Sequence, residues 1–242
     1  MAKNKLTQKQ LSEIIFWIKE IKLYEAWYLS EIPSLYYTPA PQPEQRIEAG
    51  SLAHSAILTW FERHQKPKYL EELALDPSDF PGKKVLDVGS GPMPSATCLK
   101  DAHVYSLDPL HYLYKEVGFP YHLYPRTSLI NAYAEKIPLP NRFFDVIISL
   151  NAIDHVDNLA LTARELARVA KPDCLFAMQV HYHKKTVCEP LEITDERFQN
   201  LFSWVKGLRA VKRSRKSYST TVDDTEQFVL WSNIPSTENT FA

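Results

Sequence analysis

The 242-residue sequence predicts an α/β fold, in which a doubly wound, mostly parallel sheet follows an N-terminal helical lid. Two observations lead to this class. The first 80 residues carry helical periodicity and many aromatic side chains, whereas apolar runs of strand length alternate with helical segments from Lys83 onward. That alternation is typical of a parallel sheet with helices on both faces. We therefore divide the chain into a lid, residues 1–80, and a sheet domain, residues 81–242.

The lid is expected to contain three helices. Thr7 and Gln10 form a T-x-x-Q pattern, which is typical of a capping box at a helix start, and Pro33 should end the helix that follows. The proline-rich stretch after it predicts an extended loop. A second helix is expected from about 43 to 64, and a third short helix over 69–75.

The sheet domain is expected to contain seven strands. The first five are predicted at residues 84–88, 103–108, 122–127, 143–150 and 175–182. A helix over 158–172 should connect the last two of these, because its apolar residues recur on one face. Two further strands are expected within 202–219 and 226–233, with a charged hairpin or loop between them.

Composition excludes several classes of protein. Lys and Arg number 28 and Asp and Glu number 29, for a formal net charge of -1, so the basic excess typical of a nucleic-acid binder is missing. No uncharged apolar run reaches the ~18 residues that a membrane span requires. The polar N-terminus does not resemble a signal peptide, and the three cysteines are widely spaced. We expect a reduced, cytoplasmic setting.

A cluster of glycines marks the first candidate site. Only 6 glycines occur in the chain, yet Gly82, Gly89 and Gly91 fall within ten positions, where a predicted strand runs into a Gly-x-Gly turn. Asp108 ends the next strand about 20 residues further on, where an acid can accept hydrogen bonds from ribose hydroxyls. Pro94 and Ser95 suit the first turn of a short helix after the glycine turn. Strand, glycine turn, helix, strand and acid together predict a nucleoside-binding unit.

Two kinds of nucleoside ligand compete for this unit. A dinucleotide fingerprint requires G-x-G-x-x-G, but Pro94 stands at the sixth position. Asp87 lies two residues before Gly89, where a carboxylate would repel a pyrophosphate and would suit an ammonium or sulfonium group. The expected ligand is therefore a cationic nucleoside without phosphate, and S-adenosylmethionine (SAM) fits that description.

On these residues the sequence resembles the class I (Rossmann-like) SAM-dependent methyltransferases. The resemblance covers about residues 83–182 and includes four blocks in the family's order. They are the glycine motif at 85–92, the ribose acid Asp108, the segment 132–156 and the segment 164–172. The resemblance implies a methyltransferase of the EC 2.1.1 type that uses SAM as cofactor and releases S-adenosylhomocysteine (SAH).

The resemblance also implies cofactor-binding residues by position. The methionine part, ribose, adenine and sulfonium would be held by Asp87, Gly89, Ser90, Gly91, Pro92, Asp108, Pro109, Ala134, Glu135, Asn151 and Ala152. One departure from the family is Tyr133, which replaces an acid that commonly bonds the adenine amino group. Stacking or backbone contacts would then hold adenine instead.

Candidate catalytic residues follow the fourth predicted strand. His155 titrates near neutrality and is the first candidate for a general base. Asp154 or Asp157 could orient its ring or raise its pKa. The alternative is that His155 caps the next helix or packs beneath the cofactor.

A second group follows the fifth strand. His181 and His183 are two residues apart and should point to one face of a strand. With His155 and Glu189 they match the ligand types of a His/carboxylate metal site, but the spacing is not diagnostic, and we expect no metal. We assign His181 to catalysis, and His183 and Glu189 to substrate binding, with exposure at a loop as the alternative.

The lid is expected to close the cofactor pocket and to contribute to an apolar substrate cavity. Tyr36, Tyr37 and Arg46 are candidates for contacts to the substrate, and ordinary packing is the alternative for each. A short basic run at 212–216 is typical of a solvated hairpin.

These observations predict a SAM-dependent methyltransferase acting on a small, partly apolar or aromatic metabolite, with O-methylation favoured over N- or C-methylation. We expect neither nucleic acid nor membrane as a partner. The competing hypotheses are an RNA methyltransferase and a non-catalytic SAM-binding protein in regulation or assembly.

Overall fold

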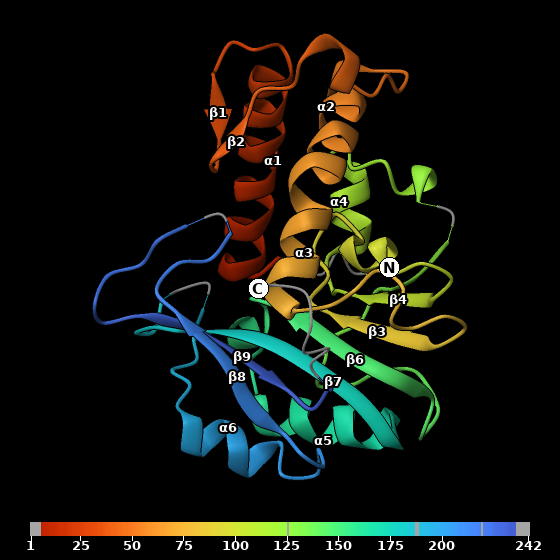
Figure 1. Ribbon diagram of the computed structural model, residues 1–242, viewed down its shortest axis with the longest axis vertical. Helices are drawn as coiled ribbons and strands as arrows, with labels where there is room; N and C mark the ends of the chain where they lie inside the picture. The colour runs from red at the N-terminus through yellow and green to blue at the C-terminus, as the bar shows by residue number, and fades with distance from the viewer. Residues whose placement is uncertain (1–5, 125, 187–188, 219, 236–242) are drawn as a thin grey trace.

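The computed structural model describes residues 6–124, 126–186, 189–218 and 220–235. Within these residues, seven strands form one sheet in the order β5-β4-β3-β6-β7-β9-β8 (Figure 1). Neighbouring strands from β5 to β7 are parallel, and β9 is antiparallel to both β7 and β8. The strands are β3 (Lys84–Val88), β4 (His103–Leu107), β5 (Thr127–Ile130), β6 (Phe144–Leu150), β7 (Ala170–Tyr182), β8 (Arg209–Ser214) and β9 (Gln227–Ser232). The mostly parallel sheet confirms the predicted fold class.

One predicted strand is wrong. Of the segment expected to form the third strand, 122–127, the first two residues lie in a 3-10 turn, η4 (Tyr121–Leu123), and β5 begins only at Thr127. The aromatic residues that made the segment look strand-like have another partner. Tyr121 and Tyr124 are buried in a cluster with residues of the lid, so their hydrophobicity serves packing outside the sheet.

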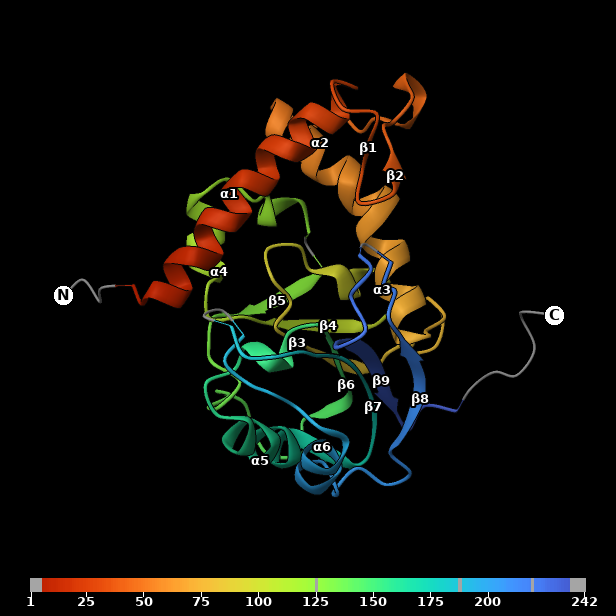
Figure 2. The same cartoon turned by 90° about the vertical axis from the view of Figure 1, so that its left-hand side faces the viewer.

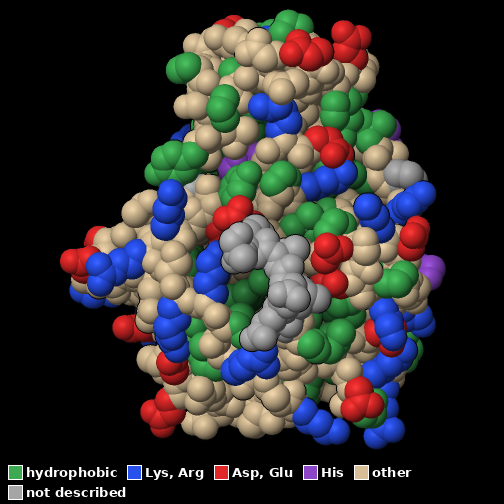
Figure 3. All heavy atoms as spheres, viewed as in Figure 1, with side chains coloured by type: hydrophobic (Ala, Val, Ile, Leu, Met, Phe, Trp, Pro, Cys, Tyr) green, Lys and Arg blue, Asp and Glu red, His purple; other side chains and the backbone are tan. Residues whose placement is uncertain are grey.

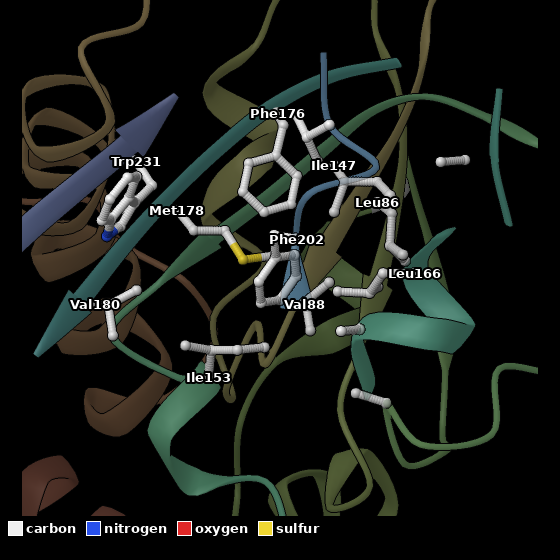
Figure 4. Packing of buried hydrophobic residues seen from close by; sticks show 14 of the residues in the cluster. Leu86, Val88, Ile147, Ile153, Leu166, Phe176, Met178, Val180, Phe202 and Trp231 are labelled. Carbon is white, nitrogen blue, oxygen red and sulfur yellow. The ribbon is translucent and has the colours of Figure 1, made fainter. Parts of the chain in front are cut away.

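Helices cover the two faces of the sheet. α5 (Leu159–Val169) and α6 (Asp195–Leu201) pack on one face, where their apolar side chains join the largest core cluster. Phe176, Met178 and Trp231 from β7 and β9 meet Phe202 there, as Figure 4 shows. α3 (Lys66–Leu73) and the 3-10 turn η3 (Ser95–Cys98) cover the opposite face. The sequence did not predict α6.

The first lid helix was predicted correctly at its start. α1 (Gln8–Tyr28) begins with the expected capping box, in which the Gln10 N–H donates to Thr7 Oγ1 and the Thr7 N–H donates to Gln10 Oε1. The helix ends before Pro33, because Ser30 adopts a positive φ of 64°. The proline-rich loop that follows includes a two-residue hairpin, β1 (Ser34–Leu35) and β2 (Thr38–Pro39).

The second lid helix starts later than predicted. Residues Pro43–Gln45 form only the 3-10 turn η1, and α2 covers Leu52–Trp60. Gly50, with a φ of +62°, breaks the expected helix just before α2 begins. The Ser51 side chain then caps α2 by accepting a hydrogen bond from the His54 N–H. α2 continues through a π-helical segment, η2 (Phe61–Gln65), directly into α3. The second residue of α3 is Pro67, which has no N–H to donate.

The first two helices pack against segments that follow β3 and β4 through a shared core. Buried residues of α1 and α2 form one cluster with Met93, Leu110, Tyr114 and the aromatic residues of 119–124. Tyr114 belongs to α4 (His111–Glu116), a helix that the sequence did not predict. Figure 2 shows α1 beside α4 and above the sheet, with α3 on the opposite side. Among the helices of the described residues, none combines the length and hydropathy that crossing a membrane would require.

Candidate functional site

The glycine turn after β3 is shaped by close packing as well as by backbone conformation. Gly89 and Gly91 adopt φ values of +67° and +62°, a region that side chains disfavour. A Cβ added to Gly89 would lie 2.3 Å from Ala152 Cβ, in the segment that follows β6. Glycine at position 89 therefore brings the ends of β3 and β6 together, and Ala152 lies against the turn.

Asp108 lies just beyond β4, and its side chain holds the glycine turn. Its Oδ2 accepts from the Gly91 N–H at 3.1 Å and its Oδ1 accepts from the Leu110 N–H at 2.8 Å. Each carboxylate oxygen has about two lone-pair sites, so both retain capacity for ribose hydroxyls. Burial raises the pKa of Asp108 to about 7.

Asp87, on β3, is fully buried and only half satisfied. Tyr69 donates its hydroxyl to Oδ1, whereas Oδ2 has no hydrogen-bond partner among the described residues. Burial raises the pKa of Asp87 to about 7. A buried carboxylate oxygen without a partner is costly, and an ammonium group or a bridging water would satisfy it. Sequence analysis could not identify Tyr69, because a position in a helix does not reveal the partner of its side chain.

The expected adenine residues have mixed surroundings. Ala134 is buried, but Glu135 Oε1 accepts the N–H groups of Asp157 and Asn158 at 2.8 and 3.0 Å, next to the start of α5. Tyr133 is about half exposed, and its hydroxyl accepts from Gln10 Nε2 at 2.8 Å. Glu135 therefore orders the loop before α5 in addition to any ligand role.

The remaining cofactor candidates lie at the carboxyl ends of the strands. Asn151 follows β6 with a positive φ of 50°, and its buried Oδ1 has no partner within the described part of the chain. Ser90 and Pro92, in the glycine turn, are buried, and Pro109 beside Asp108 is half-buried. Sheets of this kind bind ligands at this edge.

Asp154 bonds His183 and not His155. Its Oδ2 lies 3.1 Å from His183 Nε2, and both side chains are almost fully buried. This hydrogen bond is the main reason that the pKa of His183 rises to about 9. His155 is partly exposed, and its Nε2 lies 3.6 Å from Glu189 Oε1. The structure thus pairs the residues differently from the sequence expectation.

His181 and Glu189 complete this group. His181 Nε2 lies 3.0 Å from Glu226 Oε2, and its ring stacks on Phe228, with the ring centroids 4.6 Å apart. The sequence analysis missed Glu226. This residue reaches His181 because β9 pairs with β7, which places the residue before β9 opposite the end of β7. Only knowledge of the strand pairing could have found it.

The N-terminal part of α1 is tied to the loop that carries His155. Lys9 Nζ donates to the backbone carbonyl of His155 and pairs with Asp157 at 2.8 Å. Further along α1, Trp17 lies close to Gly91, because a Cβ there would be 3.7 Å from the Trp17 ring. α1 therefore covers the glycine turn.

The lid residues predicted to contact substrate have different surroundings. Tyr36 donates its hydroxyl to buried Glu20 at 2.8 Å, and its ring lies 6.3 Å from that of His64. Tyr37 is 68% exposed. Arg46 bonds Ser30 beyond the end of α1, more than ten helical residues from Trp17, so the structure does not bring it to the glycine turn.

Comparisons with known proteins agree with this fold. Residues 86–178 match a family model described as a methyltransferase domain. No match to the chain is found among curated proteins.

Three solved structures illustrate the similarity of fold. The YcgJ protein of Bacillus subtilis aligns with a TM-score of 0.52 at 20% identity, over 59% of this chain and 71% of that one. A methyltransferase solved with the Haloferax volcanii Trm112 activator aligns with a TM-score of 0.53 at 16% identity, over 72% of this chain and 91% of that one. A protein from Galdieria sulphuraria, assigned as a sarcosine dimethylglycine methyltransferase, aligns with a TM-score of 0.52 at 14% identity, over 88% of this chain and 98% of that one.

Proposed function

We propose that the chain is a class I SAM-dependent methyltransferase, because residues 86–178 match a methyltransferase-domain model, and that it methylates an oxygen of a small, partly apolar or aromatic metabolite. SAM is its cofactor. When bound, SAM supplies an electrophilic methyl group, which the acceptor takes by in-line displacement at the sulfonium, with SAH as the product.

The cofactor fits the residues of the candidate site. The unpartnered Oδ2 of Asp87 suits the amino group, directly or through water, and the free lone pairs of Asp108 suit the ribose hydroxyls. The Gly-x-Gly turn joins these two acids. This pair of buried carboxylates around a glycine turn is the observation that carries the proposal.

Aromatic side chains support an apolar or aromatic acceptor. The rings of Tyr36, Trp60, His64 and Tyr218 follow one another, with centroids 6.0, 4.0 and 5.1 Å apart. They join the lid to the segment after β8. Trp60 and His64 are buried, so a flat substrate would stack on the exposed parts of the Tyr36 and Tyr218 rings.

His155 remains our candidate for the general base. It follows β6 at the carboxyl edge of the sheet and is partly exposed, so a substrate can approach its ring. In that role its imidazole accepts the proton of the acceptor hydroxyl as the oxygen takes the methyl group. Nitrogen and carbon acceptors remain the alternatives.

RNA methylation and non-catalytic SAM binding are the competing functions. An RNA substrate calls for a basic surface, but acidic and basic side chains are interspersed on the face that Figure 3 shows. We also propose a cytoplasmic location, since both cysteines in the described residues, Cys98 and Cys174, are free thiols.

Calorimetric titration with SAM and with SAH, followed by turnover assays, tests the proposal. We expect both to bind, and methyl transfer to a hydroxylated aromatic compound but not to RNA oligonucleotides. Binding without transfer to any of a broad panel would favour the regulatory alternative. Transfer to RNA alone would favour the RNA methyltransferase alternative.

A further inference from the structure

Four potential metal ligands meet beyond the carboxyl ends of β6 and β7. Asp154 lies in the 3-10 turn η5 (Ile153–His155), His181 is in β7, and His183 and Glu189 follow β7. One ligand atom from each residue can be chosen so that all four lie within 4.8 Å of one another. From this arrangement we propose a binding site for one divalent transition ion, with Zn²⁺ as the best match.

The distances are close to those of a bound ion. Zn²⁺ binds His nitrogen and carboxylate oxygen at about 2.0–2.2 Å, so tetrahedral ligand atoms stand roughly 3.4 Å apart. Asp154 Oδ2 and His183 Nε2 are 3.1 Å apart. The widest separation in the set is bounded by 4.8 Å, so rotations of side chains by about 1 Å would complete the shell.

The hydrogen bonds of His183 leave its Nε2 suited to a cation. His183 Nδ1 lies 2.6 Å from the carbonyl oxygen of Lys184, which can only accept, so Nδ1 carries a hydrogen. In neutral imidazole Nε2 is then an acceptor, and it faces the carboxylate of Asp154. In the metal-free chain a hydrogen on Nε2 donates to Asp154, and a metal ion would displace that proton and lie between the two atoms.

His181 has the outer partner that metal-bound histidines usually have. Its Nε2 lies 3.0 Å from Glu226 Oε2, which accounts for one ring nitrogen and leaves the other for an ion. A carboxylate behind a ligating histidine fixes the tautomer and raises its basicity. The Thr186 hydroxyl donates to Glu189 Oε2 at 3.1 Å and orients that ligand in the same way.

Charge and ligand type select the ion. Asp154 is fully buried, and one of its oxygens, Oδ1, lacks a partner among the residues described. A dication would neutralise the two carboxylates of the site. Two imidazoles favour Zn²⁺ and related transition ions over Mg²⁺ or Ca²⁺, which prefer oxygen ligands. This proposal departs from the sequence expectation of no metal.

The position of the site gives the ion a role, which rests on the proposed function. His155 Nε2 lies 3.6 Å from Glu189, so the candidate base borders the site. An acceptor hydroxyl that joins the four protein ligands as a fifth would release its proton to His155 more readily, because a bound cation lowers the pKa of an oxygen ligand. Metal binding itself does not depend on this role.

Calorimetric titration of the chelator-treated full chain with Zn²⁺ tests the site. We expect about one equivalent to bind. Asp154→Asn and His183→Gln should weaken binding by more than about 100-fold, because even outer partners of a ligand are typically worth 10–100-fold. Glu226→Gln should cost about 10–100-fold. His103→Ala removes an exposed histidine on β4 and should leave binding unchanged.

Two controls keep the outcomes distinct. Circular dichroism establishes that each variant folds, and the visible spectrum of Co²⁺ bound to the unmutated chain should show four-coordinate geometry even if the variants fail to fold. Absence of stoichiometric Zn²⁺ binding, undiminished binding by folded variants, or a six-coordinate Co²⁺ spectrum would overturn the proposal. SAH binding in the same samples reports separately on the proposed function.

Discussion

Replacing Asp108 tests the ribose assignment with a magnitude that the structure supplies. Its carboxylate accepts two backbone N–H groups and retains lone pairs for two ribose hydroxyls. Losing hydrogen bonds to a charged acceptor costs about 1.5–3 kcal/mol, or roughly 10- to 100-fold in affinity. Asp108→Ala should therefore weaken SAH binding by that factor in calorimetric titration.

The same substitution has a structural cost that needs a matched control. It leaves the Gly91 and Leu110 N–H groups without their acceptor, so the free energy of unfolding should also fall by about 1–3 kcal/mol or more. Asp145, at the opposite end of the sheet, likewise accepts a backbone N–H, from Lys84 at 3.0 Å. Asp145→Ala should lower stability without changing SAH affinity. A folded Asp108→Ala variant that binds SAH as tightly as the parent would refute the assignment.

Three further predictions follow from the site. Gly89→Ala should lower the melting temperature and SAH affinity, because its Cβ would lie 2.3 Å from Ala152 Cβ, and adding Ala152→Gly should partly restore both; no loss would contradict the packing argument. His155→Ala should reduce turnover by about 10²–10⁴-fold with SAH affinity unchanged, and full activity would remove it as the base. SAH affinity should rise between pH 6 and 8, as Asp108 ionises around its pKa of about 7, and should level off at higher pH, because the ionised carboxylate is the better acceptor. Asp108→Asn should remove this part of the pH dependence, and an unchanged profile in that variant would be evidence against the role of Asp108.

Local patterns in the sequence were enough for the glycine turn, Asp108 and most of the sheet. The capping box at Thr7, the strand before Gly89 and the acid after β4 each depend on neighbouring residues alone. The segment at 122–127 was misassigned because its aromatic residues pack against the lid, and hydrophobicity alone does not reveal that partner.

The pairing of side chains across the site could not be predicted. Asp154 was one of two candidates for orienting His155, but the turn after β6 directs it to His183, 29 residues away. Tyr69 and Glu226 reach Asp87 and His181 only through the packing of α3 and the pairing of β9 with β7. Such contacts depend on tertiary structure, which a single sequence does not display.

A crystal structure of the full chain with SAH tests the central claim most directly. Density should place both ribose hydroxyls within hydrogen-bond distance of the Asp108 carboxylate, with the amino group next to Asp87 and the thioether near Asn151. A nucleoside bound away from Asp108, or a phosphate group seated in the glycine turn, would contradict the account.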